Sequence, residues 1–290
     1  MISIIITSFK EPKTIGRAIE AFLEQKLSNY ELIVVAPDKE TLDVARMYSK
    51  KNKKVKWIKD PGKGKPVALN TAMKKARGEI LVLTDGDAKV GKGSVNALIN
   101  KFDEKVGGVS GKVASINKRD EMYGFWAYIL TEGFHYLRER EQKLGKKMVG
   151  TGYLYAIKKS LVGLLPVDVL ADDAFISQQI YSHNYIISYS PEAKVYVKYP
   201  DNLIDWIRQK KRTAGRLYQF SNKSRNKIES MFEEGIAGIK TLHLIHSIKE
   251  LFWFIGLIVM RLYIWFRVFF DFRLWRRSFG KVWERVESTK

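Results

Sequence analysis

Short apolar runs alternate with amphipathic stretches in the N-terminal third of the chain. Residues 2–7, 31–35, 55–58 and 80–83 are aliphatic or β-branched and end at polar residues, which predicts strands. Residues 41–51 and 67–76 have apolar positions at helical spacing, which predicts helices. We expect another helix after the first strand, with Pro12 in its first turn, and Gly78 as the C-cap of the helix over 67–76.

These strands are continuous apolar runs, which is typical of a parallel sheet covered by helices on both faces. Ligands bind such sheets at the carboxyl ends of the strands. The residues that directly follow the strands are therefore the first candidates for a site: 8–11, 36–38, 60–65 and 84–87.

Both patterns continue in the rest of the chain. We expect a helical segment over 118–146, a strand over 149–157, a helix over 172–183, strands over 185–189 and 193–198, and a basic helix over 203–220. This order predicts one α/β domain over residues 1–225 and a separate helical region over residues 226–290.

The composition suits a globular protein with an anionic partner. Hydrophobic residues make up 46% of the 290 residues, and the formal net charge is +20. The sequence has no cysteine, which excludes disulfides and thiolate chemistry. It has no recognised nucleic-acid-binding motif, so we expect no nucleic acid among the partners. The apolar run at residues 2–6 is too short for a signal peptide, because Lys10, Glu11 and Pro12 follow it.

Two aspartates flank a glycine directly after the fourth predicted strand. Asp85 and Asp87 can project to the same side of an extended chain, and Gly86 would let a bulky anion approach the backbone. Carboxylate oxygens suit Mg²⁺ or Mn²⁺, and these ions share their ligands with a diphosphate. An ordinary Asp-Gly turn is the alternative.

Glycines and lysines open the helix over residues 67–76. Gly62, Lys63, Gly64 and Lys65 could meet phosphate oxygens, assisted by the helix N-terminus. Pro66 stands where a Walker A loop has Ser or Thr, and no third glycine completes a dinucleotide fingerprint. A flexible basic loop is the alternative.

An acidic pair and a basic helix supply the remaining candidates. Capping alone would explain Asp172 and Asp173 at a helix start, but an ionised aspartate there could also act as a general base. Gln209 and Arg212 lie on one face of the basic helix. This helix either faces solvent or lipid, or its arginine holds a diphosphate leaving group.

In this order the motifs resemble those of family 2 glycosyltransferases with a GT-A fold, over roughly residues 1–220. The motifs that carry the resemblance are Ser8-Phe9-Lys10-Glu11, Ala36-Pro37-Asp38, Gly64-Lys65 with Ala68-Leu69-Asn70, Ala76-Arg77-Gly78-Glu79, Asp85-Gly86-Asp87, Gly150-Thr151-Gly152, Ala171-Asp172-Asp173 and Gln209-Lys210-Lys211-Arg212. The resemblance implies a Rossmann-like, mostly parallel sheet flanked by helices. It also implies an inverting, metal-dependent enzyme that moves a hexosyl-type sugar from a nucleotide-diphosphate sugar to an acceptor hydroxyl.

The resemblance implies a role for each matching residue. Asp85 and Asp87 would be the Mg²⁺ or Mn²⁺ ligands of a DxD motif, Asp173 the catalytic base, and Arg212 a catalytic cation at the leaving diphosphate. The nucleotide-sugar half would cover about residues 1–115 and the acceptor half about residues 116–225. The residues implied to contact the nucleotide sugar are Ser8, Glu11, Asp38, Lys65, Asn70, Asp85 and Gln209.

Some positions depart from the family pattern. Ala36 replaces an acid that commonly contacts the nucleobase, and Thr213 replaces the tryptophan of the Gln-x-x-Arg-Trp motif of processive synthases. Two other functions stay open. One is a polyprenyl-phosphate sugar synthase, whose phosphate acceptor needs no general base, and the other is an inactive scaffold. The joint presence of Asp85, Asp87, Asp173 and Arg212 argues against the scaffold.

The C-terminal region predicts association with a membrane. Residues 251–260 carry no charge, and Arg261 would cost roughly 2.5–3.5 kcal/mol near the centre of a spanning helix. The charged residues of this stretch fall within an arc of about 120° on one helix. We expect amphipathic helices, peripheral or monotopic on the cytoplasmic face, that meet anionic headgroups and a glycan or lipid-linked acceptor. A single span and a helix packed on the soluble core are alternatives. The residues of the charged arc are Lys249, Glu250, Arg261, Arg267 and Asp271.

Overall fold

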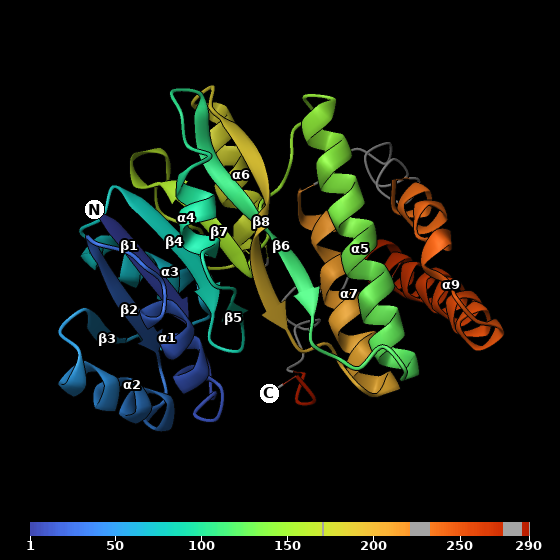
Figure 1. The fold of residues 1–290 in the computed structure, drawn as a ribbon, viewed down its shortest axis with the longest axis horizontal. Coiled ribbons are helices and arrows are strands. Elements are labelled where there is room, and N and C mark those ends of the chain that lie inside the picture. Colours follow the sequence, from blue (N-terminus) through green and yellow to red (C-terminus); the bar gives the residue numbers. More distant parts are fainter. Residues whose placement is uncertain (170, 221–232, 275–285, 290) are drawn as a thin grey trace. The chain divides into compact units, whose positions relative to one another are not determined.

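The computed structural model describes residues 1–169, 171–220, 233–274 and 286–289, and its elements are shown in Figure 1. The chain divides into two compact units. The first consists of Met1–Val113 and Glu141–Val197, and the second of Ala114–Arg140 and Lys198–Lys290. The predicted boundary near residue 225 falls outside the described residues.

The first unit contains an eight-stranded sheet in the order β3-β2-β1-β4-β7-β6-β8-β5. The four strands predicted in the N-terminal third are confirmed. They are mutually parallel, and Ile4 in the central strand β1 pairs with Leu32 of β2 and Val82 of β4. The pairings β4–β7, β6–β7 and β5–β8 are antiparallel. The strands are β1 (Ile2–Thr7), β2 (Tyr30–Ala36), β3 (Val55–Lys59), β4 (Ile80–Asp85), β5 (Lys89–Val90), β6 (Val106–Ser115), β7 (Leu154–Lys158) and β8 (Ile186–Val197).

Helices cover both faces of the parallel part of this sheet. The chain moves from β1 to β2 to β3 in one direction, so right-handed crossovers place α1 and α2 on one face. It then reverses to reach β4 beyond β1, which places α3 on the other face. The order of the strands therefore reverses between the neighbours β1 and β4. The carboxyl ends of these two strands form the switch point of the sheet, where ligands bind in such folds. The helices of this unit are α1 (Ile15–Leu23), α2 (Lys39–Lys51), α3 (Lys65–Lys75), α4 (Ser94–Ile99) and α6 (Asp172–Ser182).

Some local predictions were wrong. Pro12 lies in the turn before α1, which begins only at Ile15. The helix α3 already ends at Lys75, so Gly78 is not its C-cap. Instead, Gly78 donates its N–H to Ser3 Oγ (2.7 Å), and a Cβ at this glycine would lie 2.4 Å from the backbone N of Ser3. The glycine is therefore needed for the close approach of the chain to β1.

The two strands predicted over 185–189 and 193–198 are one strand, β8. Ser190, Pro191 and Glu192 look like a turn in the sequence, but the strand continues through them. Ser190 Oγ donates to Ala97 O (3.1 Å) and to Glu192 Oε2 (3.2 Å), which holds this point of the strand against α4.

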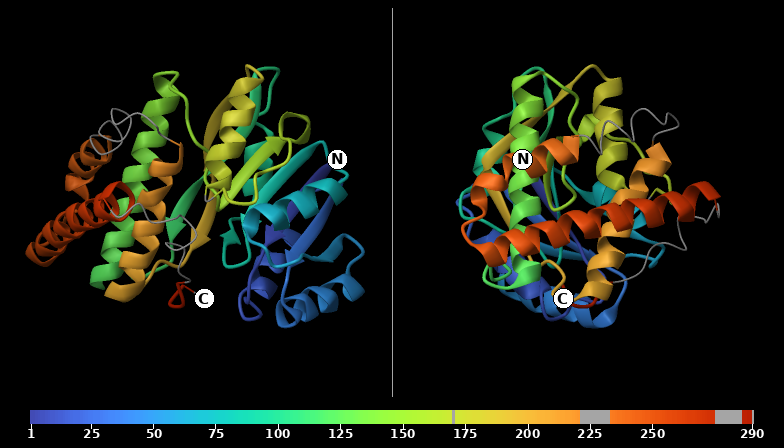
Figure 2. Two further views of the ribbon diagram at one scale, coloured as in Figure 1. Left: turned by 180° about the vertical axis from the view of Figure 1, so that it is seen from behind. Right: turned by 90° about the vertical axis from the view of Figure 1, so that its right-hand side faces the viewer.

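The second unit is helical. Its main elements are α5 (Met122–Lys143, up to Arg140 in this unit), α7 (Leu203–Phe220), a helix over 233–240 and α9 (Ile248–Phe269). Trp206 is fully buried at its centre and packs against Tyr123, Trp126 and Tyr199. The indole of Trp126 donates to Trp253 O (2.6 Å), which fixes α9 on α5. Figure 2 shows these helices from two further directions.

The charged arc of α9 faces its own unit. Arg261 forms an ion pair with Glu234, and Glu250 with Arg119 (3.2 Å). Past the end of α9, Asp271 is fully buried and binds Lys211 Nζ at 2.6 Å. Arg261, Glu250 and Asp271 each meet an opposite charge within the unit, which is how an otherwise apolar stretch tolerates them.

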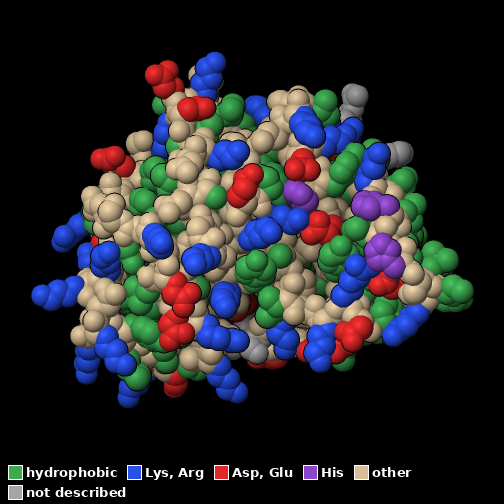
Figure 3. Space-filling model, viewed as in Figure 1, with side chains coloured by type: hydrophobic (Ala, Val, Ile, Leu, Met, Phe, Trp, Pro, Cys, Tyr) green, Lys and Arg blue, Asp and Glu red, His purple; other side chains and the backbone are tan. Residues whose placement is uncertain are grey.

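The outer face of α9 is apolar and exposed. Figure 3 shows hydrophobic side chains gathered over this helix. By length and composition, residues Ile248–Phe272 could cross a membrane, with a mean hydropathy of 1.7 over the best window. The exposed apolar residues of α9 are Ile248, Leu251, Phe252, Ile255, Ile258, Val259, Leu262, Tyr263, Phe266 and Phe269.

Candidate functional site

The ends of β1 and β4 meet at the switch point of the sheet. Ser8 and Glu11 follow β1 directly, are buried, and share a hydrogen bond from Ser8 Oγ to Glu11 Oε2 (2.7 Å). A Cβ at Gly86 would lie 2.4 Å from Ser8 Oγ and 2.6 Å from Glu11 Oε2. This packing is by itself a reason for a glycine between the two aspartates.

One carboxyl group follows each of the strands β2 and β3: Asp38 after β2 and Asp60 after β3. Asp38 caps α2 and accepts hydrogen bonds from Thr41 N (3.0 Å) and Lys10 N (2.7 Å). Burial tends to raise the pKa of Asp38, but these hydrogen bonds outweigh burial and leave it lowered. Asp60 behaves oppositely, because burial, together with the charge of Asp38, raises its pKa although it accepts a bond from Gly62 N. Neighbouring carboxyls with opposite pKa shifts are typical of functional sites.

The central contact of the site is made by Lys65, at the start of α3. Its Nζ lies 2.8 Å from Asp85 Oδ1 at the end of β4 and 3.4 Å from Asp172 Oδ2 at the start of α6. Asp85 Oδ1 also accepts a hydrogen bond from Thr7 Oγ1 (3.0 Å). One ammonium thus joins three elements that are far apart in the sequence.

The charges of this cluster shift one another. Burial would lower the pKa of Lys65, but Asp172 and Asp85 outweigh burial and hold it above its ordinary value. Burial raises the pKa of Asp172, and the negative charges of Asp173 and Asp85 add to this despite the attraction of Lys65. Three carboxylates around one ammonium leave the cluster with an excess of negative charge.

The loop at residues 150–152 closes the cluster from one side. Gly150 N donates to Ser177 Oγ (3.1 Å), and that hydroxyl donates to Asp173 O (2.6 Å), so the loop is tied to the first turn of α6. A Cβ at Gly152 would lie 3.6 Å from Lys65 Nζ and 3.8 Å from Asp173 Oδ2. With glycine at this position, the space beside both groups is left to a ligand.

The donor set fits a hard divalent cation that also binds substrate. Among the described residues, no group of three histidine, aspartate or glutamate side chains could by itself hold a metal ion. Mg²⁺ and Mn²⁺ sites for nucleotides commonly use one or two carboxylates, with phosphates and water as the other ligands. Asp85, partly exposed at the end of β4, and Asp87, in the turn behind it, suit such a shared site.

Asn70, Gln209 and Arg212 are the remaining predicted site residues. The amide of Asn70 donates to Leu165 O (2.8 Å) and accepts from Leu165 N (2.9 Å), so it ties α3 to the chain before α6. Gln209 and Arg212 belong to α7 of the second unit, where Gln209 is buried.

Sequence reasoning missed two residues with strong electrostatic signals. Asp60 lies among the residues that follow the predicted strands, but no role was predicted for it, although its position after β3 matches that of Asp38 after β2. Lys210, inside the Gln209–Arg212 motif, was counted among the charges of a basic helix, yet it is buried and stacks over Tyr199 (4.5 Å) and Trp206 (4.9 Å). Trp206, one helical turn before Lys210, was the available signal.

Comparison with known proteins places the chain in a family. The profile described as "Glycosyl transferase family 2" matches residues 3–162, and the chain belongs to this family. A probable glycosyltransferase of Bacillus subtilis, YdaM, is 28% identical over 227 residues, which cover 73% of this chain and 54% of that protein. A poly-beta-1,6-N-acetyl-D-glucosamine synthase of Staphylococcus epidermidis is 22% identical over 220 residues, covering 73% and 53%. The chain thus spans about half the length of these relatives.

Solved structures confirm the GT-A fold. The mannosyltransferase PcManGT of Pyrobaculum calidifontis, in complex with GDP-Man and Mn²⁺, superposes with a TM-score of 0.67 at 20% identity, covering 95% of this chain and 87% of that one. Residues 1–349 of TarS from Staphylococcus aureus, in complex with UDP, give a TM-score of 0.51 at 16% identity, covering 94% and 91%.

Lys210 should make stability depend on pH. Burial, with the charge of Arg261 next in size, lowers its pKa from 10.5 to about 7, although Glu234 opposes this. The unfolded chain therefore binds the proton more tightly between these two values, so stability rises with pH in this window and the full penalty applies below it. Lys210→Met removes the penalty. Its stability gain over the wild type should be larger at about pH 6 than at about pH 9 by about 2–3 kcal/mol.

Denaturant midpoints of both proteins at the two pH values would measure this difference. Lys54→Met is a suitable control, since Lys54 also lies over an aromatic ring, that of Tyr30 (4.3 Å), at the protein surface. A gain that does not change with pH would contradict the prediction.

Proposed function

We propose that this chain is an inverting, metal-dependent glycosyltransferase that moves a sugar from a nucleotide-diphosphate sugar to an acceptor at a membrane surface. The observation that carries the proposal is the cluster of Lys65, Asp85 and Asp172 at the switch point of a GT-A sheet. In this proposal, residues 1–225 form the catalytic domain and the helical region over residues 226–290 anchors it to the membrane.

The nucleotide end of the donor would lie over the ends of β1, β2 and β3. Ser8 and Glu11 form the floor there, and the ionised Asp38 and the buried Asp60 supply an acceptor and a carboxyl of raised pKa for polar groups of a nucleoside. Lys65 would leave its carboxylate partners to meet the diphosphate. A divalent cation held by Asp85 and Asp87 would neutralise part of the charge that develops on that diphosphate.

Asp173 is the proposed general base. Its Oδ1 accepts a hydrogen bond from Ala174 N (2.8 Å), which orients the carboxylate, and its Oδ2 points to the space beside Gly152. Asp172 forms an ion pair with Lys65 (3.4 Å). A base placed beside the donor can take the proton of an acceptor hydroxyl as the new bond forms, which gives a single displacement with inversion. Arg212 keeps the role that the resemblance implies, at the leaving diphosphate.

Donor turnover with and without metal tests the class of enzyme. Purified protein is offered a panel of nucleotide sugars with Mn²⁺, with Mg²⁺ and with EDTA. We expect hydrolysis or transfer of one donor that EDTA abolishes and that Asp87→Ala lowers by about a hundredfold or more, because the variant loses a metal ligand. Absence of both turnover and nucleotide binding with every donor would favour the inactive scaffold.

Replacement of the base separates two kinds of acceptor. If the acceptor is a hydroxyl, Asp173→Asn should lower the rate of transfer by about 10²–10⁴-fold, since the amide cannot take the proton. The amide oxygen can still accept the bond from Ala174 N, so the fold should be kept. Asp43→Asn, at a surface ion pair with Arg46, is the matched control.

A phosphate acceptor would give a different result. A polyprenyl-phosphate sugar synthase needs no general base, so Asp173→Asn would keep most of its transfer rate while Asp87→Ala would still lose it. Initial rates of sugar transfer to a hydroxyl acceptor and to a lipid phosphate measure the difference. Near-full transfer to a hydroxyl acceptor by Asp173→Asn would contradict its role as the base.

The outer face of α9 supports membrane association. Its interior charges are paired within the unit, so the helix can lie in the interface with the apolar face in the lipid, without crossing it. The net charge of +20 favours an anionic surface.

Acidic substitutions on this face test the membrane claim. Val259 and Phe266 are exposed and two helical turns apart. The variant Val259→Glu, Phe266→Glu should bind anionic vesicles at least about a hundredfold more weakly, because each buried apolar side chain contributes about 1.5–3 kcal/mol. Co-sedimentation with phosphatidylglycerol vesicles measures the binding. Met47→Glu, at an exposed apolar residue of α2, is the control, and equal binding of all three proteins would contradict the claim.

A further inference from the structure

Lys65 contacts one of the two carboxylates that are proposed to bind the metal ion. Its Nζ lies 2.8 Å from Asp85 Oδ1, and the same oxygen accepts a hydrogen bond from Thr7 Oγ1 (3.0 Å). With two donors already on Oδ1, a metal ion would bind the other oxygen of Asp85. It would then share one carboxylate with the ammonium of Lys65, and the two positive charges would repel each other at short range.

A second carboxylate holds this ammonium in place. Lys65 Nζ also lies 3.4 Å from Asp172 Oδ2, in the first residue of α6. The side chains of Lys65, Asp85 and Asp172 are 31%, 28% and 15% exposed, so water screens their attraction only in part. A divalent cation that arrives alone would therefore have to bind beside an ammonium that is anchored on two sides.

A diphosphate would give Lys65 another anionic partner. Lys65 is the first residue of α3, and the N-terminus of a helix favours phosphate. The ammonium ends a flexible four-carbon stem, so it can turn from one anion to another without movement of the helix. Gly152 leaves room for this turn, since a Cβ there would lie 3.6 Å from Nζ. Phosphate oxygens are also ligands of Mg²⁺ and Mn²⁺, so a diphosphate would both draw the ammonium away and help to bind the metal.

We propose that Lys65 competes with the divalent cation for Asp85 and that the diphosphate of the donor ends this competition. The metal ion then binds tightly only together with the nucleotide, and each of the two strengthens the binding of the other by the same factor. The proposal rests on the proposed function in one respect, because it takes a nucleoside diphosphate as the ligand that meets Lys65. The competition itself depends only on the contacts of Lys65 with Asp85 and Asp172.

Removal of the ammonium tests the competition without any nucleotide. Lys65→Met keeps an unbranched side chain of similar length and loses the charge. Mn²⁺ is titrated into each protein, and the electron paramagnetic resonance signal of free Mn²⁺ measures metal binding. We expect Lys65→Met to bind Mn²⁺ at least about tenfold more tightly than the wild type, within the usual range of coupling between two ligands. A lysine that only supports the fold, or that only binds the nucleotide, would not weaken metal binding in this way.

Three further variants show that the effect belongs to this contact. Lys63→Met removes a charge from an exposed lysine of the same loop, so its Mn²⁺ affinity should stay close to that of the wild type. Lys65→Arg keeps the charge and should keep the weak binding. The double variant Lys65→Met, Asp87→Ala should lose the gain, because it lacks a proposed metal ligand. Thermal unfolding checks the fold of each variant, and Lys65→Gln is a second uncharged replacement.

Nucleotide binding measures the second half of the proposal. Calorimetric titration with UDP, GDP, ADP and CDP, each with Mn²⁺ and with EDTA, gives the factor by which the metal strengthens nucleotide binding. For the nucleotide that binds, this factor should be about tenfold smaller in Lys65→Met than in the wild type, because the metal no longer needs the diphosphate to displace the ammonium. An equal factor in the two proteins would contradict the role of the diphosphate.

The two titrations separate this proposal from the proposed function. Equal Mn²⁺ affinity of the wild type and Lys65→Met, no detectable binding by either, or the same gain in Lys63→Met would overturn the competition and leave the transferase standing. If none of the nucleotides binds, the proposed function is contradicted. Tighter Mn²⁺ binding by Lys65→Met would then still establish that Lys65 competes with the metal.

Discussion

The ion pairs of Lys65 are the interaction on which the architecture of the catalytic unit depends. The ammonium joins the end of β4 to the start of α6, and Lys65 itself starts α3. Each of these elements ends or begins at the same edge because parallel strands direct their carboxyl ends to one side of the sheet. The negative charge that collects there would be unstable without a cation. In this structure the cation is the ammonium of Lys65.

The parallel half of the sheet was predictable because its strands are buried on both faces. The runs at residues 2–7 and 80–83 are apolar throughout, and no other element explains such short runs. The strand β6 escaped prediction because Gly107, Gly108 and Gly111 replace the side chains that would have marked it. A Cβ at Gly107 would lie 2.6 Å from Leu161 Cδ1, so the glycines reflect tight packing that is determined by residues distant in the sequence.

The candidate site, too, was predictable only in part. The positions after the strands identified Ser8, Glu11, Asp38 and Asp85, since topology alone brings these ends together. Sequence could not show that Asn70 holds the backbone of Leu165, because the two are 95 residues apart and meet only in the folded chain. Nor could it show that Asp172 lies close enough to pair with Lys65 (3.4 Å). That contact depends on the direction in which α6 begins, and the hydrogen bond from Gly150 N to Ser177 Oγ helps to fix this direction.

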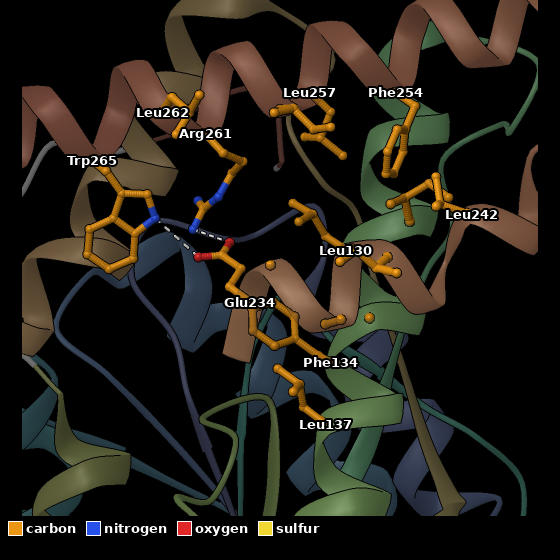
Figure 4. A pocket seen from close by; sticks show the side chains of 17 residues that line it. Leu130, Phe134, Leu137, Glu234, Leu242, Phe254, Leu257, Arg261, Leu262 and Trp265 are labelled. Carbon is orange, nitrogen blue, oxygen red and sulfur yellow. Dashed lines mark hydrogen bonds and ion pairs between the residues drawn. The ribbon is translucent and has the colours of Figure 1, made fainter. Parts of the chain in front are cut away.

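The helical unit resolves the conflict that Arg261 poses in an apolar helix. An unpaired arginine in this position would oppose any contact with lipid, and a helix wholly buried in protein would not leave ten large apolar side chains exposed. Both features are compatible when the charged arc is paired inward and the apolar arc faces outward. Figure 4 shows the inward pairing of Arg261 with Glu234, at an apolar cavity of about 420 Å³ between α5, the helix over 233–240 and α9. One helix can therefore carry both an arginine and ten large exposed apolar side chains, because the two kinds of residue lie on different faces.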